Sequence, residues 1–76
     1  MNIKRRKRID AVLELLASIQ NEIEEIQQEE QDYLDNMPEN LEGSEKYSIA
    51  EEAIDNLESA LNAVIEAADY LESSKG

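Results

Sequence analysis

The sequence predicts an all-α protein in which residues 1–76 form one domain, an antiparallel two-helix hairpin (a helical coiled coil) that dimerises into a four-helix bundle. Three observations lead to this prediction. Apolar residues recur at alternating steps of three and four in both halves of the chain. The only proline, Pro38, lies near the middle. With no Cys and no His, neither a disulfide nor the usual zinc or haem ligands can support so small a core, which leaves self-association.

The first predicted helix covers residues about 3–35. Its heptad positions a fall at residues 9, 16, 23 and 30 and its positions d at 12, 19, 26 and 33, and all except Glu30 are apolar or aromatic. We expect Glu30 to reach solvent or to bond Tyr33 or Tyr47, and to fix the helix register at some cost in stability. At about 1.5 Å per residue the helix is roughly 50 Å long, so only another long helix can cover it.

Residues about 36–44 form the predicted loop. Pro38 disfavours the helical conformation for the residue before it, and Gly43 permits a positive φ angle. A connection this short folds the second helix back along the first. The N-terminus of the first helix therefore lies near the C-terminus of the second.

The second predicted helix covers residues about 45–73. Ser44 and Ser48 are both candidate N-caps, and we favour Ser44 because Tyr47 then belongs to the apolar row of the helix. That row follows the same steps of three and four: Tyr47, Ala50, Ile54, Leu57, Leu61, Val64, Ala68 and Leu71. Ala53, Ala60 and Ala67 recur beside it at intervals of seven, and such small side chains let two helices approach closely.

Several apolar residues lie beside or outside these two rows, among them Leu34, Ile49 and Tyr70. A helix that is apolar over a wide arc usually contacts two neighbours. We therefore predict that two hairpins pair. The residues expected to mediate self-association are Ile9, Val12, Leu13, Leu15, Leu16 and Ile65. The alternative is that a different protein covers the surplus apolar surface.

The charges are distributed very unevenly. The net charge is −12, and residues 4–8 alone carry five positive charges, so the rest of the chain carries −17. In the hairpin this basic cluster is expected to act as an electrostatic clasp against the acidic C-terminal end of the second helix, with about 0 to 1 kcal/mol for each exposed pair. The clasp residues are Lys4, Arg5, Arg6, Lys7 and Arg8. Direct nucleic-acid binding through them is a third functional hypothesis, which the remaining negative charge opposes.

Catalysis and metal binding find little support in the residue types. The pairs Glu22-x-x-Glu25 and Glu52-x-x-Asp55 resemble in spacing the magnesium-binding motifs of all-α nucleotide pyrophosphatases, but their heptad positions scatter them over outer faces. No Lys or Arg lies between residues 9 and 45 to hold a phosphate, and the serines have no His or Cys partner. We therefore expect no enzymatic activity and no cofactor.

A resemblance adds a biological setting. Residues 33–47, with an Asn-Met-Pro-Glu turn followed by Ser-Glu-Lys-Tyr, and residues 50–60 resemble small acidic helical-hairpin proteins of phages and prophages of Gram-positive bacteria. The resemblance implies a protein of phage origin that acts in the cytoplasm of its bacterial host. No segment of the sequence suggests a membrane span or a signal peptide, so we expect a soluble, unprocessed protein.

The leading functional hypothesis is a protein-binding module that inhibits a host defence or nucleic-acid-processing protein through an acidic, DNA-like surface. The expected contact residues are Glu24, Glu25, Glu29, Asp32, Glu51, Glu52, Asp55, Glu58 and Tyr70. For each acid taken singly, ordinary helix solubility is the better explanation of the charge. Taken together, the net charge exceeds the magnitude of about 2 to 8 that solubility alone recommends. The alternative is a coiled-coil module for oligomerisation or assembly.

Overall fold

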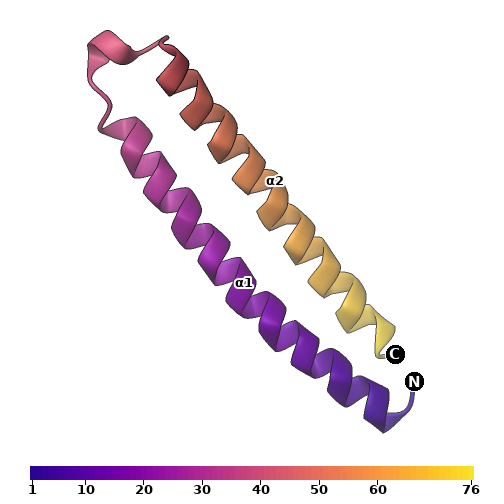
Figure 1. Ribbon diagram of the computed structural model, residues 1–76. Coiled ribbons are helices and arrows are strands. Elements are labelled where there is room, and N and C mark those ends of the chain that lie inside the picture. The colour runs from indigo at the N-terminus through magenta and orange to yellow at the C-terminus, as the bar shows by residue number, and fades with distance from the viewer.

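The computed structural model describes residues 1–76 as two long antiparallel helices joined by a loop (Figure 1). Helix α1 spans Ile3–Asp35 and helix α2 spans Glu45–Ser74, with a 3-10 turn, η1, at Glu39–Leu41 in the loop. The molecule measures 59 × 15 × 12 Å, and both termini lie at the end opposite the loop. The prediction of an all-helical hairpin is confirmed. Neither helix has a stretch that is both long and apolar enough to cross a lipid bilayer.

Side-chain caps set where each helix begins. The Oδ1 of Asn2 accepts a hydrogen bond of 2.8 Å from the backbone N–H of Arg5 and caps α1. Ser44 Oγ accepts one of 3.3 Å from the N–H of Tyr47, so the preference for Ser44 over Ser48 as the second cap is confirmed. Gly43 just before it has φ +79°, in the left-handed region that favours glycine.

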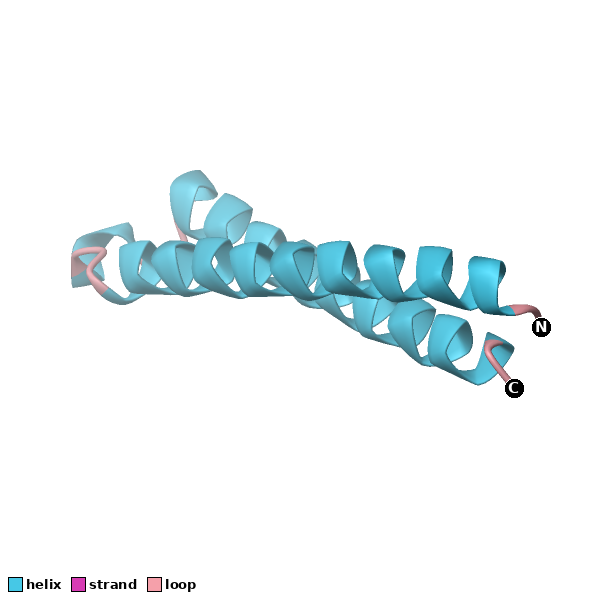
Figure 2. Ribbon diagram, turned by 90° about the horizontal axis from the view of Figure 1, so that it is seen from below, coloured by secondary structure: helices cyan, strands magenta, loops and turns pink.

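The row of α2 that faces α1 is the predicted one. All its members are half-buried or buried, and two of them, Ala50 and Leu61, are the only buried residues of the chain, at 1% and 9% exposure. Figure 2 shows the helices crossing at a shallow angle. The row stays half-buried or buried from Tyr47 to Leu71, over most of the length of α2. The hydrophobic core is therefore a single line of side chains between the two rods.

The row of α1 that faces α2 differs from the prediction at half its positions. Residues 9, 16, 23 and 30 are half-buried as expected, but they are joined by residues 13, 20, 27 and 34. The predicted d positions instead remain exposed: Val12 41%, Ile19 45%, Ile26 43% and Tyr33 51%. The apolar arc of α1 is wider than one neighbour can cover, and α2 covers the side that carries Leu13 and Leu34.

Candidate partner-binding surfaces

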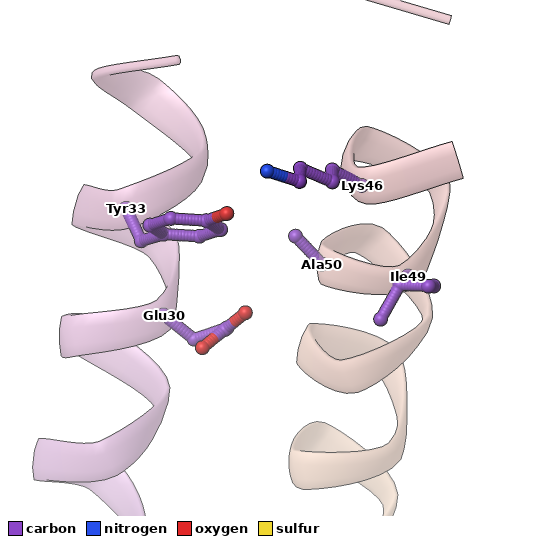
Figure 3. Close-up of a pocket in the computed structure, with 5 residues that line it drawn as sticks. All are labelled: Glu30, Tyr33, Lys46, Ile49 and Ala50. Carbon is purple, nitrogen blue, oxygen red and sulfur yellow. The ribbon is translucent and has the colours of Figure 1, made fainter. Parts of the chain in front are cut away.

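An open hollow of about 380 Å³ lies between the helices near the loop. Glu30 and Tyr33 of α1 and Lys46, Ile49 and Ala50 of α2 line it (Figure 3). In that view the Lys46 side chain extends towards Tyr33, and the Glu30 carboxylate points towards α2. Side chains from α1 and from α2 thus meet here, on one side of the hairpin.

The surface around this hollow continues along the hairpin as an apolar face. Residues seven apart point in nearly the same direction on an α-helix, so the direction of Tyr33 is shared by Val12, Ile19 and Ile26, whose exposures are nearly equal. On α2, Ala53, Ala60 and Ala67 follow Lys46 at the same interval. Ala63 and Tyr70 follow Ile49 at two and three times that step. We call these three rows the apolar face.

The opposite side of the hairpin is acidic. Gln31 lies two residues from Tyr33, and Glu51 two from Ile49, about 200° around their helices, so they line a separate hollow on the other side. Asp55 lines it too, and Gln27 Nε2 donates a hydrogen bond of 2.7 Å across the helices to Glu58 Oε2. Seven-residue steps from these positions define the acidic face, whose polar members are Asp10, Glu24, Gln31, Ser48, Glu51, Asp55, Glu58, Asn62, Asp69 and Glu72. Ala17 and Ile65 are its apolar members.

The structure brings together about half of the predicted acidic contact residues. All eight acids are exposed, and Glu24, Glu51, Asp55 and Glu58 share the acidic face. The other acids point along the backs of the two helices or towards the edge of the apolar face: Glu25, Asp32, Glu52 and Glu29. The predicted contact Tyr70 is 69% exposed and lies on the apolar face, away from the acidic group.

The clasp between the termini differs from the prediction. Lys75 Nζ of α2 lies 2.8 Å from Asp10 Oδ1 of α1 and 3.0 Å from Glu72 Oε1, and these are the only ion pairs in the chain. The hydrogen bond from Lys75 to Asp10 raises the pKa of the lysine above its ordinary value, and the one to Glu72 adds a smaller increase. The cation of the clasp is therefore the C-cap residue of α2, and its acids are Asp10 of α1 and Glu72 of α2.

None of the five predicted clasp residues forms an ion pair. All five are exposed, and only Arg6 lines the hollow beside Lys75. The sequence signal for Lys75 is its position seven residues after Ala68, which makes it the last member of the α2 row. A lysine in a row of apolar residues is easily overlooked, although its aliphatic stem suits such a position.

The predicted self-association residues divide into two groups. Ile9, Leu13 and Leu16 are half-buried within the hairpin, whereas Val12, Leu15 and Ile65 are exposed. Val12 belongs to the apolar face and Leu15 lies at its edge, but Ile65 is seven residues after Glu58 and lies on the acidic face.

Glu30 is half-buried and forms no hydrogen bond with Tyr33 or Tyr47, which corrects one of the expectations for it. Tyr33 lines the same hollow as Glu30 without a hydrogen bond to it, and Tyr47 is half-buried in the α2 row. Glu30 instead shares its hollow with the ammonium group of Lys46 (Figure 3).

The paired carboxylates Glu22, Glu25, Glu52 and Asp55 do not converge. No three carboxylates of the chain lie close enough together to hold a metal ion. The four acids are all exposed.

No protein-family model, curated protein sequence or solved structure matches this chain.

Proposed function

We propose that this chain is a non-enzymatic protein-binding module that dimerises into a four-helix bundle through its apolar face and presents its acidic face to a basic partner protein. The observation that supports the proposal is the separation of the two surfaces. Apolar rows gather on the side of Tyr33 and Ile49, and carboxylates gather on the side of Glu51 and Glu58.

This separation lets both surfaces act at once. A contiguous exposed apolar face on a soluble protein usually marks an interaction site, because its contact with water is unfavourable. When that face is covered, the opposite face remains in solvent. A dimer then displays two acidic faces, one on each side of the bundle, on rigid helices.

The partner class that fits the acidic face is a protein that normally binds nucleic acid. Carboxylates spaced along a rigid rod create a negative potential like that of a phosphate backbone, and a basic cleft attracts either one. The resemblance of residues 33–60 to phage and prophage proteins supports a host defence or nucleic-acid-processing factor as the target. Occupation of its cleft would inhibit it by excluding its nucleic acid.

The test compares two triple variants that change the net charge equally, from −12 to −9. Glu51→Gln, Asp55→Asn and Glu58→Gln neutralise the acidic face, whereas Glu25→Gln, Asp32→Asn and Glu52→Gln neutralise the helix backs. Each tagged protein is used to capture proteins from a Gram-positive bacterial lysate at low salt, and the captured proteins are released with duplex DNA or with salt.

We expect the native chain and the helix-back variant to capture the same basic protein, which duplex DNA and salt both release. The acidic-face variant should lose most of it. Equal capture by both variants, or a captured protein that DNA does not displace, would contradict the acidic-face proposal.

A second candidate, an assembly module, is favoured by the exposure of Val12, Ile19 and Ile26. In that case the apolar face binds a different structural protein. The contact would persist at high salt, because apolar contacts are not screened, and Ile19→Gln with Ile26→Gln would abolish it. The acidic-face variant would then bind as well as the native chain.

A further inference from the structure

We infer that the apolar face is covered by a second copy of this chain with its loop at the opposite end, so that the two α1 helices pack antiparallel against each other. This inference specifies the dimer of the proposed function and rests on it. It fixes the orientation, the symmetry axis and the role of the N-terminal cations, none of which follows from dimerisation alone.

The exposed area of the hairpin leaves room for such a partner. The chain exposes 5756 Å², whereas a folded monomer of 8.6 kDa exposes about 4,700 Å² by the usual scaling with mass. The excess exposed area is roughly 1,000 Å². Each partner in a standard interface buries a similar area, about 800 Å². One further copy is therefore enough to bring the chain to an ordinary exposed area.

The α1 row of the apolar face is evenly spaced about its own midpoint. Val12, Ile19, Ile26 and Tyr33 are evenly spaced over about 32 Å, and their midpoint lies between residues 22 and 23. A two-fold axis through that midpoint sets Val12 against the partner's Tyr33 and Ile19 against the partner's Ile26. On α2, the alanines of the apolar face let the second pair of helices approach closely.

Charge decides between the two possible orientations. Residues 1–12 and 66–76, at the end with the termini, contain six Lys or Arg and four Asp or Glu, for a charge of +2. Residues 29–55, at the loop end, contain one Lys and ten Asp or Glu, for a charge of −9. Loops at the same end would place −9 beside −9. Loops at opposite ends place +2 beside −9, which is attractive at both ends.

The reversed arrangement also gives the N-terminal cations a partner. The same axis brings residues 4–8 of one copy beside residues 37–41 of the other, near Asp35, Glu39 and Glu42. Within their own hairpin these cations form no ion pair. The cluster thus acts between copies and selects the orientation, as exposed charges at the rim of an interface commonly do.

The chain has no cysteine, so single-cysteine variants report the orientation cleanly. Glu22→Cys places the thiol beside the proposed axis, within reach of the same residue in the second copy. The matched control is Glu25→Cys, three residues further on the back of α1, and a second control is Leu15→Cys, whose equivalent lies opposite residue 30. All three residues are exposed, and each is tested with a short thiol-to-thiol cross-linker and sized under denaturing conditions.

We expect Glu22→Cys to yield a covalent dimer with at least tenfold greater efficiency than either control, and denaturant added before the reagent to abolish it. A dimer by light scattering in which Glu22→Cys links no better than Glu25→Cys would overturn this orientation while leaving dimerisation intact. A mass of one chain, 8.6 kDa, would overturn both. Neither result depends on the acidic-face variants, so the binding proposal is tested separately.

Discussion

Lys75 Nζ lies 2.8 Å from Asp10 Oδ1, a contact between residues 65 positions apart that joins the two free ends of the hairpin. A second bond to Glu72 holds the ammonium group on the acidic face. The hairpin is thus tied at one end by its loop and at the other by one lysine. The five cations at residues 4–8 form no ion pair within the hairpin and remain available to another molecule.

This pair predicts a loss of stability in alkali. The pKa of Lys75 is raised in the folded state, so its contribution to the free energy of unfolding is complete below the ordinary value of 10.5 and is lost as pH rises through the raised value. The urea midpoint, measured about one unit below and about one unit above 10.5, should fall more in the native chain than in Lys75→Gln. Both chains retain the same tyrosines, so equal falls would contradict the assignment.

Leu61 is one of the two buried residues of the chain, and its truncation tests the packing between the two helices. Leu61→Ala should destabilise the fold by about 2 to 5 kcal/mol, because it leaves a cavity at the centre of the core row. Ile65 lies one helical turn after Leu61 but on the exposed acidic face, so Ile65→Ala should change stability by no more than about 0.5 kcal/mol. Chemical unfolding at one fixed protein concentration measures both, and similar losses would show that Ile65 is also covered.

The cap at Ser44 is a further test of the loop. Ser44→Ala removes the acceptor of the Tyr47 N–H and should cost about 1 kcal/mol of stability. Ser48→Ala, within the first turns of α2 and exposed, should be nearly neutral. The reverse order, measured by urea unfolding, would mean that α2 begins later in solution.

The N-terminal cations should influence association more than folding. Arg5→Gln with Arg8→Gln removes four pairs from the symmetric dimer, two for each copy. The dimer should weaken about 4- to 900-fold at low salt, if each lost pair is worth about 0.2 to 1 kcal/mol. High salt should bring the native and variant dissociation constants together, because these pairs are exposed. Sedimentation at two ionic strengths measures both, and a variant that dimerises as tightly as the native chain at low salt would exclude the cross-copy pairing.

Much of this architecture could be predicted from the sequence because its signals are local. Pro38 and Gly43 mark the loop, Ser44 caps the second helix, and the row through Ala50 and Leu61 holds most of the large aliphatic side chains of that helix. The rotation of α1 could not be predicted. Its apolar arc includes both Val12 and Leu13, and periodicity gives the width of such an arc but not the part that one neighbour covers.

The apolar face and the acidic face could be predicted from the sequence only in part. The alanines at residues 53, 60 and 67 and the ridge at 12, 19, 26 and 33 were both readable as rows, but only the folded hairpin shows that they lie on one side. The acids were too widely spread to sort by sequence, since 18 of the 19 are exposed and they occur on the outer sides of both helices and in the loop. The folded hairpin separates them, because Gln31, Glu51 and Asp55 line one hollow on the side opposite Tyr33 and Ile49.

The most direct test of the two-faced hairpin is sedimentation equilibrium of the native chain and of Ile19→Gln with Ile26→Gln, over a wide range of concentrations. Both isoleucines are exposed within a single hairpin, at 45% and 43%, so their replacement removes little of its own core. We expect the native chain to have twice its mass of 8.6 kDa and the variant to shift strongly towards a single chain. A native chain that stays helical at 8.6 kDa at every concentration would contradict the account.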